Sequence, residues 1–262
     1  MTNCMVRSFD HAGYYETRLV LTLAALAVAV WHAVARRDRS LLVAFACGAV
    51  LQGYMEYRLY AAGMRGDDYT LSLFGLTLSS WAACLAQGLL EGGVLAMMSY
   101  WFVDLCATSD DRLRRARLYA AMCGLIVLLA IVVGMLARGR AVTSPRPIFT
   151  EGAITSLTLQ SIAMLAIVWC LRGRAFHWLG LFYAGSVLYV TLTFEPLRAL
   201  GARYIADRAT DGAISVVTGM RGFWLVLYSD LFEVAGGKIH YFVIPYALGW
   251  LRVGGKRWFD DV

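Results

Sequence analysis

Apolar blocks alternate with short polar segments along the whole chain. Each block is close to the roughly 20 residues that an α-helix needs to cross a bilayer. The blocks span residues 17–36, 40–62, 78–103, 116–137, 153–171, 176–199 and 223–251. The pattern predicts an all-α polytopic membrane protein, a bundle of seven transmembrane helices in which residues 1–262 form a single integral membrane domain.

Three stretches depart from a plain helical span. The apolar stretch 71–103 is too long for one untilted helix, so Leu71–Ser79 is expected to be an interfacial or re-entrant piece that precedes the third span. The connection 200–222 is long enough for a short surface helix. The last block is too long for one span, so it is expected either to project beyond the lipid or to bend, at Gly236 and Gly237 or at Pro245.

The composition supports a membrane location. Hydrophobic residues make up 60% of the chain, charged residues make up only 16%, and the mean hydropathy is +0.60. These values exclude a soluble enzyme, a disordered regulator and a secreted disulfide scaffold. A bacterial inner membrane and a eukaryotic endomembrane both remain open as the location.

The distribution of basic residues predicts the orientation. The net charge is +6, and most arginines lie between the apolar blocks, where cations orient a membrane protein and contact anionic lipids. The shortest and most basic connections, 36–39, 112–117, 172–174 and 252–257, all fall on one side. We therefore expect the N-terminus outside and the C-terminus inside, with membrane lipids and no nucleic acid as partners of the basic residues.

The chain offers no pattern of metal ligands. Its six cysteines form no C-x-x-C motif and no cluster with histidine, so they are interpreted as small buried hydrophobic residues. His32 and His177 each adjoin a tryptophan at the end of a predicted helix, which is typical of interfacial anchoring. We expect no metal and no cofactor.

Ionisable and amide side chains occur inside the second and third blocks. Gln52-Gly-Tyr-Met-Glu56 and Gln87-Gly-Leu-Leu-Glu91 share the pattern Q-G-x-x-E. A spacing of four residues places each glutamine one helical turn from its glutamate, where the amide can donate to the carboxyl group. Because an ionisable group costs roughly 3 kcal/mol or more at the bilayer centre, such residues indicate a functional site.

The last two blocks add further acids. Asp230, Glu233, Gly237 and Tyr241 fall on one stripe of a helix that should face the bundle interior. Counted from the helix ends, Glu56, Glu91, Glu195 and Asp230 could all open into one cavity in the outer half of the membrane. Crowding and burial would then keep some of these carboxyl groups protonated, and therefore able to donate a proton.

Several of these acids have simpler interpretations. Glu91 could form a hydrogen bond between helices, and Asp230 could make a structural contact to an arginine or to the backbone. Glu195 is three residues from Arg198 and could form an interfacial ion pair with it. Glu233 could pair with Lys238.

Some tyrosines lie too deep for all of them to belong to the membrane interface, and they predict an aromatic-lined pocket suited to a polyene, a ring system or a developing carbocation. These tyrosines are Tyr54, Tyr57, Tyr100, Tyr183, Tyr189 and Tyr228.

A seven-helix chain with Glu56 late in its second span and Asp230 early in its seventh resembles the membrane-bound terpene cyclases of meroterpenoid pathways. In that family an N-x-x-W-E-like segment and an aspartate of the last helix are thought to start cyclisation of a prenyl chain by proton transfer. Here Gln52 or Gly53 stands at the asparagine position and Met55 at the tryptophan position. The resemblance implies a metal-free cyclase of the isomerase or lyase type in which Glu56 and Asp230 transfer the proton.

The leading hypothesis is an integral membrane enzyme that uses carboxylic acids as general acid and base on a prenylated or other lipid-like small molecule. Glu56 or Asp230 would protonate an alkene or epoxide with help from Glu91. The side chains expected to bind the substrate are Gln52, Tyr57, Gln87, Tyr228, Glu233 and Tyr241.

Three other functions remain open. A proton-coupled transporter or channel would use the same acids as a relay. A non-catalytic subunit of a membrane complex would use the polar groups as ties between helices. A retinal-binding photoreceptor, by resemblance to microbial rhodopsins, would carry its Schiff base on Lys238 with Glu91 as counter-ion, although Val234 stands where that family usually has an acid.

Overall fold

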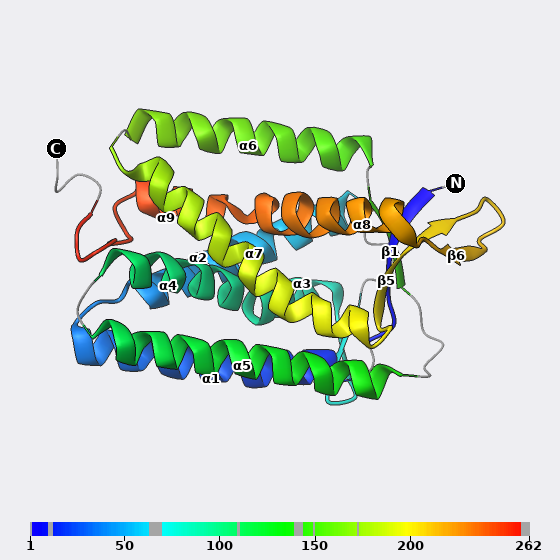
Figure 1. Ribbon diagram of the computed structural model, residues 1–262, viewed down its shortest axis with the longest axis horizontal. Coiled ribbons are helices and arrows are strands. Elements are labelled where there is room, and N and C mark those ends of the chain that lie inside the picture. Colours follow the sequence, from blue (N-terminus) through cyan, green and yellow to red (C-terminus); the bar gives the residue numbers. More distant parts are fainter. Residues whose placement is uncertain are drawn as a thin grey trace.

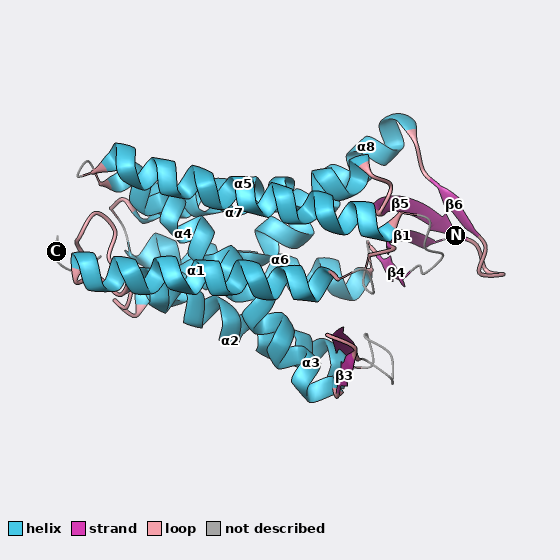
Figure 2. Cartoon of the chain, turned by 90° about the horizontal axis from the view of Figure 1, so that it is seen from below, coloured by secondary structure: helices cyan, strands magenta, loops and turns pink. Residues whose placement is uncertain are grey.

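A computed structural model describes residues 2–9, 13–62, 70–108, 111–138, 144–148, 150–171 and 173–257. Within these ranges the chain is mostly helical, and its long helices run side by side along the longest axis of the molecule (Figure 1). The first and the last segments that the structure describes lie at opposite ends of that axis (Figure 1). A small sheet covers the end where the N-terminus lies (Figure 2).

The first six helical stretches are continuous, and the last is broken. The continuous ones are α1 (Tyr14–Arg36), α2 (Ser40–Ala61), α3 (Ser80–Gln87) joined through the π-helix η1 (Gly88–Gly93) to α4 (Val94–Ala107), α5 (Arg112–Ala137), α6 (Glu151–Leu171) and α7 (Ala175–Ala199). The last consists of α8 (Gly219–Leu227), the π-helix η2 (Tyr228–Ala235), the 3-10 turn η3 (Gly236–Lys238) and α9 (His240–Ala247). The predicted break at Gly236 and Gly237 is confirmed.

Five of these stretches are long and apolar enough to cross a membrane. They are Tyr14–Arg36, Ser80–Ala107, Arg112–Ala137, Ile154–Leu171 and Ala175–Ala199. The described residues thus confirm a helical chain with membrane-spanning candidates. The two other predicted spans depart from that form because α2 carries Gln52, Glu56 and Arg58, and because the last stretch is divided into short pieces.

A four-stranded antiparallel sheet joins three distant parts of the chain. Its strand order is β4 (Ser144–Pro147), β1 (Thr2–Arg7), β5 (Arg203–Arg208) and β6 (Ile214–Val216). The N-terminal strand therefore lies between the α5–α6 and the α7–α8 connections. The expectation of a surface helix within 200–222 was wrong, because β5 finds its partner about 200 residues earlier in the chain.

The segment that precedes α3 is a second, smaller β-structure. Strands β2 (Leu71–Leu73) and β3 (Leu76–Leu78) form a hairpin whose turn residues, Phe74 and Gly75, have φ of 51° and 76°. Two successive residues with positive φ are typical of the tight turns that join antiparallel strands. The segment is separate from the third helix, as the sequence predicts, and it is extended.

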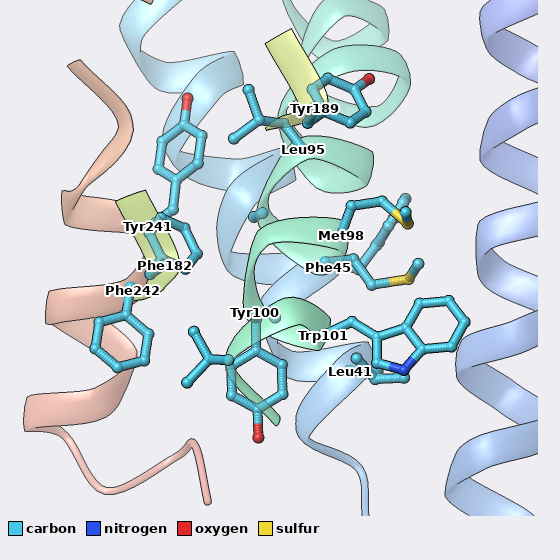
Figure 3. Close-up of a cluster of buried hydrophobic side chains, with 14 of the residues drawn as sticks. Leu41, Phe45, Leu95, Met98, Tyr100, Trp101, Phe182, Tyr189, Tyr241 and Phe242 are labelled. Carbon is cyan, nitrogen blue, oxygen red and sulfur yellow. The ribbon is translucent and has the colours of Figure 1, made fainter. Parts of the chain in front are cut away.

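The helix α4 forms the centre of the hydrophobic core. Trp101 and Tyr100 of α4 are buried, and Phe182 of α7 stacks on Phe242 of α9 with ring centroids 5.3 Å apart (Figure 3). Because α3, η1 and α4 are one continuous central helix, the polar side chains of η1 lie inside the protein, where they need partners.

Helix α2 crosses η1 with its backbone in contact. A Cβ atom on Gly88 would lie 2.3 Å from the carbonyl oxygen of Ala49, and one on Gly92 would lie 2.3 Å from Cβ of Gln52. Glycine is required at both positions because any side chain would collide with the neighbouring helix. This contact brings the two Q-G-x-x-E segments side by side.

We predict that Gly88→Ala lowers the stability of the protein by about 2 kcal/mol or more, because the added methyl group meets a backbone carbonyl that cannot move away. Gly180→Ala is the matched control, since a Cβ there meets nothing within 4 Å. Thermal unfolding of both variants in detergent provides the measurement. Equal melting temperatures for Gly88→Ala and the wild type would contradict the close crossing.

Candidate active site

A cavity of about 480 Å³ lies inside the bundle and reaches the sheet. Three carboxylic acids from three different helical segments line it: Glu56 of α2, Glu91 of η1 and Glu233 of η2. The amides Gln52 and Gln87 line it as well. The structure therefore brings together both Q-G-x-x-E segments and one acid of the last helical stretch.

Gln52 is the centre of one hydrogen-bond network. Its Nε2 donates to Oε1 of Glu56 at 2.8 Å, which is the predicted bond between residues four apart. Its Oε1 accepts from Lys238 Nζ at 2.6 Å and from the hydroxyl of Tyr241. Two donors on the amide oxygen fix the orientation of the amide, so the NH₂ group faces Glu56 and holds that carboxylate toward the cavity.

Glu91 belongs to a second network on α1. Its Oε1 accepts from the hydroxyl of Tyr14 at 3.0 Å, and Gln87 Nε2 donates to the hydroxyl of Tyr15 at 3.1 Å. The predicted bond from Gln87 to Glu91 is therefore replaced by bonds to α1. The reason is the π-helix of η1, whose wider turn removes the alignment of residues four apart.

Arg18 joins the second network to α7. Its Nη1 donates to the hydroxyl of Tyr189 at 3.0 Å, and its guanidinium lies 4.8 Å from the ring centroid of Tyr14. Arg18, Tyr14 and Tyr189 all line the cavity. A buried cation thus stands beside Glu91, so that a negative charge on this carboxylate is compensated within the protein.

Asp230 lies outside the cavity lining, contrary to the expectation of one shared recess. Its carboxylate binds Arg198 and also accepts from Arg203 Nη2 at 3.3 Å. Burial, together with the charges of Arg198 and Arg7, lowers the pKa of Arg203 to about 10, while Asp230 opposes this change. Asp230 therefore joins two mostly buried arginines.

Glu195 also lies away from the cavity lining. It forms the ion pair with Arg198 that its spacing of three residues allows, and its side chain is 54% exposed. The simpler of the two interpretations of Glu195 is confirmed.

Three tyrosines predicted to bind substrate lie outside the cavity lining. The ring of Tyr57 lies 5.2 Å from that of Trp81, and the ring of Tyr228 lies 6.1 Å from that of Phe232. Tyr241 contributes indirectly, because its hydroxyl donates to Gln52. The aromatic rings that do line the cavity are Tyr14, Tyr189 and Phe194, and the sequence argument did not single out Tyr14 or Phe194.

Five basic side chains lie in the cavity lining, and the sequence analysis missed four of them. They are Arg7, Arg18, Arg146, Arg203 and Lys238. Only Lys238 had been considered, as an ion-pair partner or a retinal site. A local signal existed for Arg18, which begins an apolar run and is costly to bury there. None existed for the three sheet arginines, because only the pairing of distant strands brings them together.

Two further results bear on this site. Among the residues that the structure describes, no group of three or more His, Cys, Asp or Glu side chains is placed to hold a metal ion. Comparisons with family models, with curated proteins and with solved structures found no match to this chain.

We predict that Asp230→Asn destabilises the protein by about 3 kcal/mol, because it removes the charge of the carboxylate that binds two mostly buried guanidinium groups, Arg198 and Arg203. Glu195→Gln, which removes an exposed partner of the same Arg198, should cost less than about 1 kcal/mol. Thermal unfolding in detergent compares the two variants. A melting temperature of Asp230→Asn equal to that of Glu195→Gln would show that Asp230 has no such structural role.

Proposed function

We propose that this chain is an integral membrane enzyme that uses Glu56 and Glu91 as general acid and base on a prenylated or other lipid-like substrate in its internal cavity. One observation carries the proposal: two Q-G-x-x-E carboxylic acids on crossing helices line the same cavity, each oriented by hydrogen bonds. Positioned acid–base groups of this kind contribute typically 10²- to 10⁴-fold to a reaction rate.

The surroundings of the two acids suit proton transfer to an alkene or epoxide. Protonation of an alkene or of an epoxide generates positive charge on carbon, which the faces of aromatic rings stabilise. Tyr14, Tyr189 and Phe194 supply such rings in the cavity. One carboxylic acid would donate the proton, and the other carboxylate would accept a proton when the product forms.

The terpene-cyclase resemblance enters this proposal in a changed form. The acid of the second span, Glu56, keeps the role that the resemblance implies. The aspartate of the last span is bound to Arg198 and Arg203, so we assign the second acid–base role to Glu91. Glu233 is the only acid of the last helical stretch in the cavity lining, and we place it among the substrate-binding groups.

We predict that Glu56→Gln and Glu91→Gln each reduce turnover by about 100-fold or more while the protein stays folded, because glutamine keeps the shape but transfers no proton. Purified protein in detergent would be incubated with prenyl compounds that carry terminal alkenes or epoxides, and products would be measured by mass spectrometry. Glu195→Gln is the control, since that acid is exposed and outside the cavity lining.

Full turnover in both cavity variants would disprove the acid–base assignment. If the wild type formed no product from any of these compounds but took up solutes into liposomes in response to a pH gradient, the result would favour a proton-coupled transporter.

We further propose that the chain crosses the membrane seven times, with the N-terminus outside and the C-terminus inside. The sheet end would then face outward and the basic connections would face inward. In support, α2 and the broken stretch from α8 to α9 run alongside the five apolar helices, and the first and last described segments lie at opposite ends of the bundle (Figure 1).

This topology predicts the labelling of single cysteines. In a variant whose exposed Cys106 and Cys170 are replaced by serine, a membrane-impermeant maleimide should label Ser215→Cys in intact cells and Lys256→Cys only after permeabilisation. Ser215 lies on the exposed strand β6, and Lys256 lies close to the C-terminus. The reverse labelling pattern would establish the opposite orientation.

A further inference from the structure

Three arginines lie on the same face of the sheet. Arg7 of β1 is directly opposite Arg203 of β5, and Arg146 of β4 is opposite Met5 of β1. Met5 and Arg7 are two residues apart in one strand, so their side chains point to the same face. Because all three arginines also line the cavity, this face forms its end wall.

Positive charges meet on this face of the sheet. The side chains of directly opposed residues start roughly 5 Å apart, and like charges at that distance repel each other. Burial is the main cause of the lowered pKa of Arg203, and the charges of Arg198 and Arg7 add to it. Asp230 neutralises part of the charge, but it also neutralises Arg198, which lies outside the cavity lining.

The excess of positive charge extends into the cavity. Five basic side chains line it against three acidic ones. One of the five, Arg18, lies one helical turn inside α1 from Tyr14, and it is only 6% exposed. The basic groups therefore run from the sheet inward, and the concentration of three arginines at the sheet is the most positive part of the lining.

The rest of the lining is different in character. Away from the sheet, apolar side chains from α2, α4, α6, α7 and η2 take part in the wall: Met55, Leu59, Leu95, Leu157, Val190 and Val234. The cavity thus joins a cationic end to an apolar body. A molecule that satisfies both parts needs an anionic head and a hydrocarbon tail.

We propose that the ligand of this cavity is a phosphate-bearing amphiphile, whose phosphate group binds Arg7, Arg146 and Arg203 at the sheet and whose hydrocarbon tail lies along the apolar wall. Phosphate fits better than a carboxylate, because its three terminal oxygens accept hydrogen bonds from several guanidinium groups that approach from different strands. This inference rests on the proposed function, in that it names the substrate class of the same site. It assigns the head of the molecule to the sheet and the reacting hydrocarbon to the region of Glu56 and Glu91.

The test measures binding rather than turnover. Purified full-length protein in maltoside detergent, which carries no phosphate, would be titrated with farnesyl phosphate, with farnesol and with inorganic phosphate in a calorimeter. We expect farnesyl phosphate to bind at least tenfold more tightly than either of the other two. Equal binding of farnesol would overturn the phosphate site, and equal binding of inorganic phosphate would overturn the assignment of an amphiphile.

Variants locate the site. Arg7→Gln and Arg146→Gln should each weaken farnesyl phosphate binding by about tenfold and leave farnesol binding unchanged, since each removes one charge-assisted contact to phosphate. Arg208→Gln is the matched control, because Arg208 is an exposed residue of the same sheet outside the cavity lining. Farnesyl phosphate binding that is unchanged in both cavity variants would overturn the proposal. Melting temperatures close to that of the wild type would establish that the variants are folded.

The binding test separates this inference from the proposed function. Selective phosphate binding without any turnover would leave the ligand assignment standing and remove the enzymatic one. Turnover of neutral prenyl compounds without selective phosphate binding would leave the enzymatic assignment standing and remove the ligand assignment.

Discussion

The contact between the backbones of α2 and η1 is the constraint on which the rest of the site depends. Side chains usually keep helices apart, and a polar group on one helix then faces the apolar surface of another. Here Gly88 and Gly92 remove that spacing. Gln52, Glu56 and Glu91 consequently lie at one crossing, where their hydrogen bonds can be satisfied inside the protein. Without that close approach, two carboxylic acids at this depth would each need a separate environment.

The two π-helices explain where sequence reasoning succeeds and where it fails. The bond from Gln52 to Glu56 could be predicted because α2 is a regular α-helix, and the structure contains it. The same reasoning fails for Gln87 and Glu91, which lie at η1. It fails again for Asp230, which was placed on a stripe with Glu233 although η2 changes the angular spacing of both residues. A local pattern carries no signal for such a change in the helical repeat.

Long-range pairing accounts for most of what the sequence did not reveal. The apolar blocks were recognisable because length and hydropathy are local properties. The sheet depends on β1 meeting strands that follow more than 130 residues later, and a six-residue strand such as Thr2–Arg7 has no strong pattern of its own. The positive end wall of the cavity was hidden for the same reason, because each of its arginines is unremarkable within its own segment.

The position of β1 has a consequence for the order of assembly. As the inner strand between β4 and β5, it cannot complete its hydrogen bonds until the ribosome has produced residues 203–208, after α1 to α7. Until then one edge of this strand is unpaired, and the sheet that covers this end of the bundle is incomplete. During biogenesis the cavity would therefore be open at the sheet side, and closure by β5 would be among the last steps to occur.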